Sequence, residues 1–281
     1  MKERIQFSDF DALWAEQVRA HPSERMTDDR AEQAFWQRFM AKKQGYAPDA
    51  SSRLVLEQLR PLLRKKEIDT ALEFGPGWGN YTIDLARMCR ALTCVDISED
   101  VLAFIRRIGE EQGCGNIRTV HEKWECFSMA EQFDLVFGYN CFYRQSSLRD
   151  CFARMDALAL KLCIAGMNTG LAPAWFREIE AAGADLRWEW KDYLYFVCVL
   201  YQMGIDPNVI IVPFHKELVY PDMESAIDGE SARIRGGTLS RGQVAEILAR
   251  HFRRREDGCL CAEVRFRGGI VWWEPAAVRD R

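Results

Sequence analysis

The feature that most constrains the fold is a regular alternation of short apolar segments and longer amphipathic segments in the middle of the chain. The apolar segments have the length of buried strands, and the amphipathic segments carry apolar residues at helical spacing. The predicted strands are residues 69–74, 91–97, 116–122, 133–139 and 161–167. Strands that alternate with helices in this way are typical of a parallel sheet covered on both faces. We therefore predict an α/β fold with a doubly wound, mostly parallel, Rossmann-like sheet.

The two ends of the chain have a different character. Residues 1–50 contain two helical patterns and no β-branched run, so we expect N-terminal lid or cap helices rather than part of the sheet. Residues 51–281 are expected to form the sheet domain, with a mostly helical insertion at about residues 215–257. Residues 259–275 are expected to form a final strand, or a hairpin around their paired glycines, which would add an antiparallel strand near the C-terminus.

Two local signals mark helix ends. Pro61 lies in the helical pattern of residues 51–66 and is expected to kink or stop that helix. Ser98 is placed to cap the next long helix, because acidic residues follow it in the first turn.

Charge, hydropathy and cysteine usage limit the partners. The formal net charge is -4 and the sequence pI about 5.7, which lacks the basic excess of nucleic-acid-binding proteins. The longest apolar run, residues 193–205, is too short to cross a membrane. The cysteines are scattered, and no second pair or histidine cluster completes a metal site with Cys259 and Cys261. We expect a cytoplasmic protein without a nucleic-acid, membrane or metal partner.

A glycine-rich loop, "FGPGWGN", follows the first predicted strand. Gly75, Gly77 and Gly79 suggest that a ligand approaches the backbone closely, although tight packing of strand and helix is the alternative. A dinucleotide fingerprint would require a glycine where the chain has Asn80, so pyrophosphate binding is disfavoured.

Two acidic residues end the first two predicted strands. Asp96 follows the glycine loop at the distance from which an acid binds the ribose hydroxyls in nucleotide-binding folds, and Ile97 beside it could lie on an adenine ring. Glu73 could attract an ammonium group. An adenosyl group with an attached amino acid fits these residues better than a phosphate does.

With these two motifs, "LEFGPGWG" and "VDIS", residues 51–167 resemble the class I S-adenosylmethionine-dependent methyltransferases of the small-molecule type. The tail is similar to a bacterial subgroup with "LYQMGI" and a closing "VWW". The resemblance implies S-adenosylmethionine as cofactor, S-adenosylhomocysteine as product and a small-molecule acceptor.

The resemblance also implies roles for individual residues. The three glycines would lie along the methionine part, Glu73 near its amino group and Asp96 at the ribose. The adenine edge would meet Lys123 and Trp124, although this contact could fall to Trp124 or Glu122. The predicted cofactor-binding residues are therefore Glu73, Gly75, Gly77, Gly79, Asp96, Ile97, Lys123, Trp124 and Gly138.

The segment "GYNCFYRQ", residues 138–145, follows the fourth predicted strand and normally faces cofactor and acceptor in this family. It lacks the proline-rich tetrapeptide of enzymes that methylate nucleic-acid amino groups. Asn140 and Tyr143 are the predicted catalytic residues, with Tyr139 and Arg144 also placed to orient an acceptor. Asn140 and Tyr143 could equally be loop residues tied to the backbone.

Several other residues could act in catalysis or substrate binding, but a structural role is the preferred interpretation for them. His121 or His215 could act as a base, but a lone histidine is more often structural, and Cys141 is interpreted as packing rather than as a reactive thiol. An aromatic segment could line an acceptor pocket or a homodimer face, although helix core is preferred. Its members are Trp188, Trp190, Tyr193, Tyr195, Phe196 and Tyr201.

Three other functions stay open at this point. The motifs do not exclude transfer of the aminocarboxypropyl arm of the cofactor, or a cofactor-binding module without catalysis. A nicotinamide-dependent dehydrogenase is disfavoured by Asn80.

Overall fold

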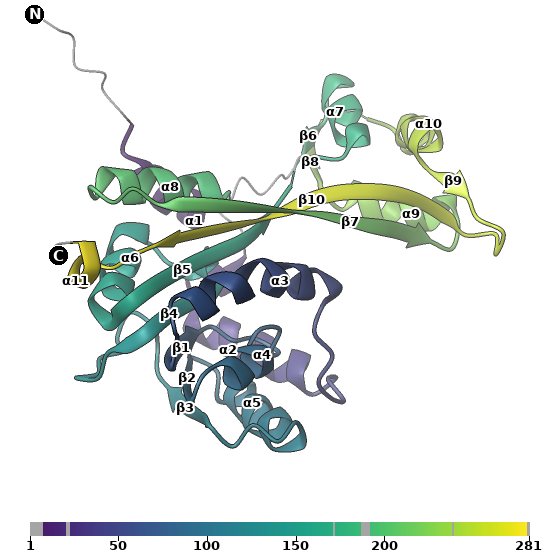
Figure 1. The fold of residues 1–281 in the computed structure, drawn as a ribbon. Helices are drawn as coiled ribbons and strands as arrows, with labels where there is room; N and C mark the ends of the chain where they lie inside the picture. The colour runs from purple at the N-terminus through teal and green to yellow at the C-terminus, as the bar shows by residue number, and fades with distance from the viewer. Residues whose placement is uncertain (1–7, 21–22, 171, 187–191, 238, 280–281) are drawn as a thin grey trace, which may run out of the picture. The chain divides into compact units, whose positions relative to one another are not determined.

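The alternating segments form a mixed sheet with helices on both faces (Figure 1). The computed structural model describes residues 8–20, 23–170, 172–186, 192–237 and 239–279. The chain divides into two units, described separately below. Unit 1 comprises Met1–Asn168, Lys191–Val212 and Gly268–Arg281, and unit 2 comprises Thr169–Trp190 and Pro213–Arg267.

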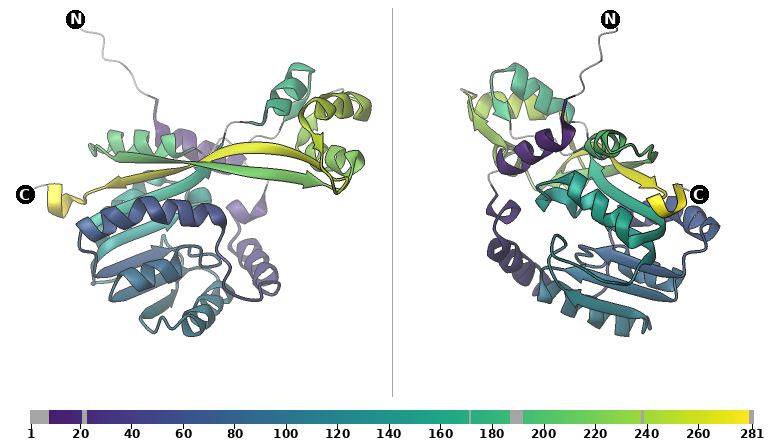
Figure 2. Two further views of the ribbon diagram at one scale, coloured as in Figure 1. Left: turned by 45° about the vertical axis from the view of Figure 1, so that its right-hand side comes forward. Right: turned by 90° about the vertical axis from the view of Figure 1, so that its left-hand side faces the viewer.

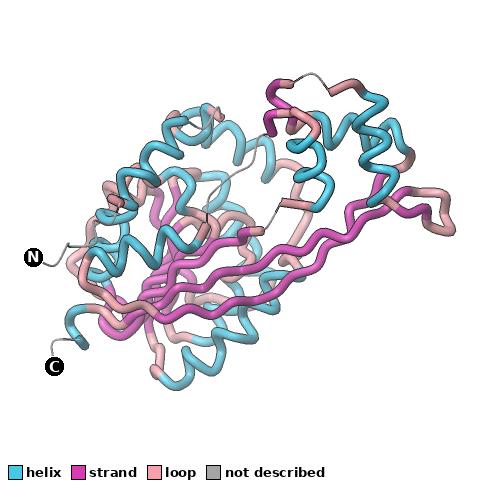
Figure 3. The backbone as a smooth tube through the Cα atoms, turned by 90° about the horizontal axis from the view of Figure 1, so that it is seen from above, coloured by secondary structure: helices cyan, strands magenta, loops and turns pink. Residues whose placement is uncertain are grey.

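The centre of unit 1 is a run of parallel strands in the order β3-β2-β1-β4-β5. The first five strands are β1 (Thr70–Phe74), β2 (Ala91–Asp96), β3 (Ile117–His121), β4 (Phe133–Tyr139) and β5 (Ala159–Thr169). Beyond β5 the sheet continues with β10 (Leu260–Trp273) and the edge strand β7 (Asn208–Tyr220), which lie side by side in Figure 3. The predicted fold class, including the antiparallel C-terminal strand, is confirmed.

Helices of unit 1 lie before, between and after these strands (Figure 2). They are α1 (Phe10–Ala20), η1 (Glu24–Met26), α2 (Asp29–Met40), α3 (Ala50–Lys65), α4 (Thr82–Met88), α5 (Glu99–Glu111), η2 (Phe142–Arg144), α6 (Leu148–Leu158), α8 (Tyr193–Gln202) and α11 (Ala276–Arg279). Ser98 caps α5 as predicted, because its side chain accepts a hydrogen bond from the backbone of Val101. The helical N-terminal segment is present as α1 and α2.

The two faces of β1 show how the sheet is covered. Leu72 and Phe74 belong to a buried apolar cluster that also contains residues of α1, α6 and α8. Glu73 points to the opposite face, where its carboxylate accepts a hydrogen bond from Thr82 of α4. Helices therefore pack on both faces of the strand, as expected for a doubly wound sheet.

Unit 2 has its own apolar cluster, which includes Trp175, Ile227 and Leu248. Besides the outer parts of β7 and β10, it contains α7 (Ala174–Ala181), β6 (Asp185–Leu186), α9 (Met223–Ser231), β8 (Ile234–Gly236), α10 (Arg241–His251) and β9 (Arg253–Arg254). Two of its helices lie in the insertion predicted at 215–257, together with the end of β7. The unit also takes in residues 169–190, which the sequence analysis had assigned to the sheet domain.

Of the two alternatives for residues 259–275, the structure has the strand, which is continuous over residues 260–273, and not the hairpin. Gly269 lies where this strand passes an aromatic ring, because a Cβ on Gly269 would lie 2.2 Å from Cδ1 of Tyr193. Of the alternatives for Pro61, a stop of the helix is wrong. Helix α3 does not stop at Pro61, because its apolar face stays buried through Leu63 and Lys66 still donates to the carbonyl of Leu62.

Candidate cofactor site

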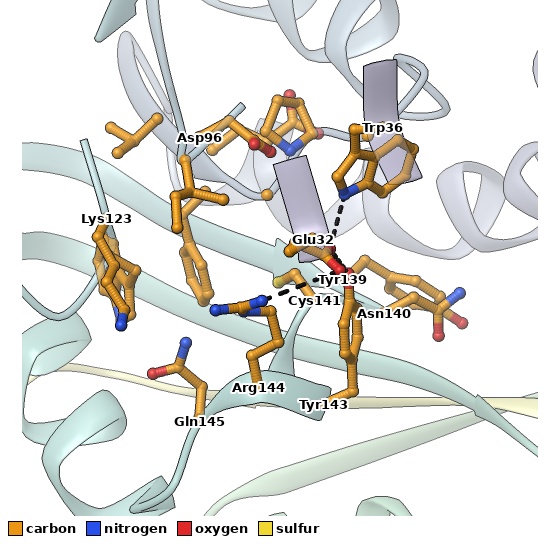
Figure 4. A pocket seen from close by; sticks show the side chains of 18 of the residues that line it. Glu32, Trp36, Asp96, Lys123, Tyr139, Asn140, Cys141, Tyr143, Arg144 and Gln145 are labelled. Carbon is orange, nitrogen blue, oxygen red and sulfur yellow. Dashed lines mark hydrogen bonds and ion pairs between the residues drawn. The ribbon is translucent and has the colours of Figure 1, made fainter. Parts of the chain in front are cut away.

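A cavity of unit 1 lies where the parallel strands end, the position at which open α/β sheets bind ligands. Its lining comes from the ends of β1, β2 and β4, from the segment after β3 and from α2 (Figure 4). The lining residues are Glu32, Trp36, Glu73, Phe74, Gly75, Pro76, Gly77, Trp78, Asn80, Tyr81, Val95, Asp96, Ile97, Lys123, Trp124, Glu125, Tyr139, Asn140, Cys141, Tyr143, Arg144 and Gln145. Nine of the predicted cofactor and catalytic residues therefore meet at one cavity.

The three glycines of the loop serve different purposes, although all have positive φ. A Cβ on Gly75 would lie 2.5 Å from Cβ of Cys141, and one on Gly79 would lie 2.6 Å from Cδ1 of Ile108. These two glycines allow tight packing, the alternative considered for the loop. Gly77 faces the cavity, where a Cβ would meet only the ring of Trp36 at 3.4 Å. Gly79 and Gly138 do not contribute to the lining.

Two buried carboxylates line the cavity at the ends of β1 and β2. Glu73 accepts a hydrogen bond from the hydroxyl of Thr82 at 2.7 Å, and Asp96 accepts one from the backbone N–H of Ser98 at 2.8 Å. Burial raises the pKa of Glu73 and of Asp96 to about 7. A ligand that brings hydrogen-bond donors or positive charge would stabilise the ionised form of each carboxylate.

Two of the residues predicted to contact the adenine already contact other side chains of the protein. The ring of Trp124 stacks on Phe74 with a centroid distance of 4.1 Å, and Lys123 directs its ammonium group to Asp29 at 3.2 Å. Ile97 is half-buried in the lining. Glu122, the alternative contact, is exposed and lies outside the lining.

The segment after β4 is held by hydrogen bonds. Asn140 has a φ of 56°, and its side-chain oxygen accepts a hydrogen bond from the backbone of Asn168 at 2.7 Å. The hydroxyl of Tyr143 donates to the carboxylate of Glu32. Burial raises the pKa of the Tyr143 hydroxyl. Both side chains line the cavity, and both are also tied to other parts of the chain.

Glu32 is a lining residue that the sequence analysis did not single out. Its carboxylate is almost fully buried and accepts hydrogen bonds from Nε1 of Trp36 at 2.7 Å and Nε of Arg25 at 2.8 Å. The spacing of Glu32 and Trp36, one helical turn apart, is the only local signal for this pair.

Comparison with known proteins identifies the domain. A family model for a methyltransferase domain matches residues 71–159, which contain the glycine loop and the strands β1 to β4. Residues 71–159 of the chain form a methyltransferase domain. No curated protein sequence matches the chain.

Solved structures share the fold of this methyltransferase. A putative methyltransferase from Bacillus halodurans is 14% identical with a TM-score of 0.51, over 78% of this chain and 100% of that one. The magnesium protoporphyrin IX methyltransferase of Synechocystis, solved with bound S-adenosylhomocysteine, is 11% identical with a TM-score of 0.51, over 89% of this chain and 100% of that one. At such identities the likeness establishes the fold.

The two histidines that the sequence analysis named as possible bases of the methyltransferase lie away from the cavity. His121 is exposed and its Nε2 lies 2.9 Å from the carbonyl oxygen of Ile97. His215 belongs to unit 2, where its Nδ1 lies 2.7 Å from Glu263. Within the described ranges, no cluster of histidine, cysteine or acidic residues could hold a metal ion, and no helix is long and apolar enough to cross a membrane.

The aromatic segment forms mainly helix core. Tyr195 packs edge-on against Trp14, and Phe196 is fully buried, while Tyr201 is exposed on α8. Trp188 and Trp190 lie outside the described residues.

The packing role of Gly75 leads to a stability prediction. Gly75→Ala should lower the free energy of unfolding by about 1–3 kcal/mol, because the new methyl group overlaps Cys141. Gly113→Ala is a matched control, since Gly113 also has positive φ but has open space around it. Chemical denaturation measures both. Equal losses would show that backbone strain alone, and not the contact with Cys141, accounts for the effect.

Proposed function

We propose that this methyltransferase transfers the methyl group of S-adenosylmethionine to a small-molecule acceptor in the cavity at the ends of β1, β2 and β4. The observation that carries the proposal is the convergence of Glu73, Gly77 and Asp96 on one cavity with Asn140 and Tyr143. S-adenosylmethionine supplies an activated methyl group on a sulfonium, so the protein's tasks are alignment and exclusion of water.

The residues present fit this cofactor. Asp96 is a buried acceptor at the position expected for ribose hydroxyls, and Glu73 is a buried carboxylate suited to an ammonium group. Nε1 of Trp78, in the glycine loop, is buried and has no hydrogen-bond partner among the residues that the structure describes. A ligand acceptor atom would satisfy this donor. Ile97, Lys123 and Trp124 are proposed for the adenine side.

Asn140 and Tyr143 are proposed to orient the acceptor. Asn140 stands on a strained backbone at the end of β4, and such positions are enriched at functional sites. The raised pKa of Tyr143 keeps its hydroxyl protonated, so it acts as a hydrogen-bond donor or acceptor and not as a free base.

We infer the class of acceptor from the net charge of the chain and from the sequence of the loop after β4. The net charge of -4 and the absence of a proline-rich tetrapeptide there both disfavour nucleic acid. We also propose a cytoplasmic location, from the ten cysteines that form no disulfide pattern in the sequence. A homodimer, with the aromatic segment as its possible face, stays a prediction, which sedimentation of the purified protein tests.

Label transfer tests the function. The protein is incubated with S-adenosylmethionine labelled in the methyl group and with a cell extract, and label is followed into low-mass and nucleic-acid fractions. We expect label in a low-mass compound other than the cofactor, with the product heavier by one methylene unit. At a cofactor concentration near the dissociation constant of the unaltered protein, an Asp96→Ala variant should transfer much less label. Labelled methylthioadenosine together with an unlabelled product heavier by the aminocarboxypropyl arm would assign the alternative transfer, because the methyl group then stays on the leaving group. Label in nucleic acid would contradict the acceptor class.

The two raised pKa values predict a pH dependence of cofactor binding. Ionised Asp96 accepts hydrogen bonds from ribose hydroxyls and ionised Glu73 attracts an ammonium group, so binding favours the ionised forms. Because both groups have a pKa of about 7 in the free protein, the affinity for S-adenosylhomocysteine should fall as the pH drops below 7. The loss is up to roughly tenfold per group and pH unit.

Calorimetric titrations at about pH 8 and about pH 6 measure this loss. The Asp96→Asn variant serves as control, because it removes one titrating group and should bind weakly with a flatter pH profile. An affinity of the unaltered protein that does not change between the two pH values would contradict the role of the buried carboxylates.

A further inference from the structure

Helix α2 contacts the segments that line the cavity after successive strands. Nε2 of Gln33 donates to the carbonyl of Ile97, after β2, at 3.1 Å. Asp29 pairs with Lys123, after β3, at 3.2 Å. Trp36 lies over Gly77, after β1. One helix outside the sheet thus reaches around the carboxyl ends of the strands that form the proposed cofactor site.

Glu32 lies at the centre of these contacts (Figure 4). Its carboxylate joins two sets of donors. Trp36 and Arg25 lie on its own segment of chain and donate to it at 2.7 and 2.8 Å. On the segment after β4, Tyr143 donates a hydrogen bond to Glu32, and Arg144 forms an ion pair with it at 3.9 Å. Arg144 strengthens the connection by donating to the backbone carbonyls just before α2, at 2.6 and 3.1 Å.

This division of partners makes the contact reversible. If α2 moves away, Glu32 loses Tyr143 and Arg144 but keeps Trp36 and Arg25, so its buried carboxylate stays paired. Arg144 loses Asp29 and Glu32 in that movement, and its guanidinium would turn to water. Water replaces the lost hydrogen bonds at small net cost. Helix α1 differs, because Trp14 and Val18 belong to the large apolar cluster, whose exposure is costly. Trp36 and Met40 of α2 are also buried, but they lie outside that cluster.

The chain after α2 can absorb such a movement. Residues 41–49 form turns and irregular structure, and a Cβ on Gly45 would meet no atom within 4 Å. We propose that α2 is a wall of the cofactor site that closes over the bound cofactor, and that Glu32 is the positioning residue that holds it against Tyr143 and Arg144. This inference rests on the proposed function. The sequence analysis expected a lid or a cap here, and the inference assigns to α2 a part in retaining the cofactor and to Glu32 the contact that holds the helix in place.

Hydrogen exchange of the full chain with and without S-adenosylhomocysteine tests the closure. We expect the ligand to slow exchange in α2 by about tenfold or more, as cofactor binding shifts the helix toward the closed state. The amides of α3, which packs through a buried apolar face, serve as internal control and should change little. Binding without any protection of α2 would overturn the proposal and leave the proposed function intact; no binding would remove both.

Dissociation rates test Glu32. Glu32→Gln keeps the shape of the side chain and removes its charge, and Tyr143→Phe removes the hydroxyl that donates to it. Both should raise the dissociation rate of S-adenosylhomocysteine about 5- to 30-fold, with the association rate unchanged, as measured by stopped-flow displacement.

Glu57→Gln on the exposed side of α3 is the matched control and should leave both rates unchanged. A general structural defect would instead lower the melting temperature without a specific change in dissociation. Dissociation rates of Glu32→Gln and Tyr143→Phe that equal the rate of the control would overturn the role of Glu32.

Discussion

An Asp96→Ala variant is expected to bind S-adenosylhomocysteine about 10- to 150-fold more weakly than the unaltered protein, a loss of about 1.5–3 kcal/mol. The carboxylate of Asp96 is buried at the end of β2, and its one hydrogen bond among those described comes from the backbone of Ser98. Its remaining acceptor positions face the cavity, where ribose hydroxyls would find a charged partner. Removing that partner leaves the ligand hydroxyls without their strongest acceptor.

The variant should stay folded, because a buried carboxylate with a raised pKa does not stabilise the free protein. Asp100→Ala is the matched control: Asp100 is exposed in the first turn of α5 and lies outside the cavity. Calorimetry measures the affinity of each variant for S-adenosylhomocysteine, and thermal unfolding measures the stability of each variant. An affinity of Asp96→Ala equal to that of Asp100→Ala would exclude the ribose assignment.

Gly77→Val is expected to abolish measurable binding of S-adenosylhomocysteine. Of the three loop glycines, Gly77 is the one whose added side chain would point into the cavity toward Trp36. A valine there occupies the space along the loop that the methionine arm requires, and its φ of 54° adds backbone strain of about 1–2 kcal/mol.

Gly113→Val separates the two effects. Gly113 has a φ of 69° and no atom within 4 Å of an added Cβ, so its substitution carries similar strain without filling the cavity. We expect both variants to lose comparable stability in denaturant unfolding, and only Gly77→Val to lose the ligand. Retained affinity in Gly77→Val would mean that the ligand does not pass along the glycine loop.

The sheet could be predicted from the sequence because each of its signals is local. Apolar runs of strand length, helical spacing between them and a cap such as Ser98 are all read within a few residues. The carboxylates Glu73 and Asp96 were found for the same reason, since each ends a recognisable strand and the ends of parallel strands meet at one edge.

Features that depend on distant contacts could not be predicted. Paired glycines suggest a turn in the sequence, but Gly269 is needed where β10 passes the ring of Tyr193. Glu32 reads as one more acid on a polar helix, and only its approach to Tyr143, more than a hundred residues away, makes it part of the cavity. Its burial follows from tertiary packing, which helical periodicity alone does not encode.

The central claim, that the cavity at the strand ends is an S-adenosylmethionine site, is tested most directly by calorimetric titration of the purified full chain with S-adenosylhomocysteine, with NADH titrated in parallel. We expect binding of S-adenosylhomocysteine in the micromolar range, about -8 kcal/mol, and no binding of NADH, because Asn80 stands where the dinucleotide fingerprint requires glycine. A folded protein that gives no heat with S-adenosylhomocysteine, or that binds only NADH, would contradict the claim.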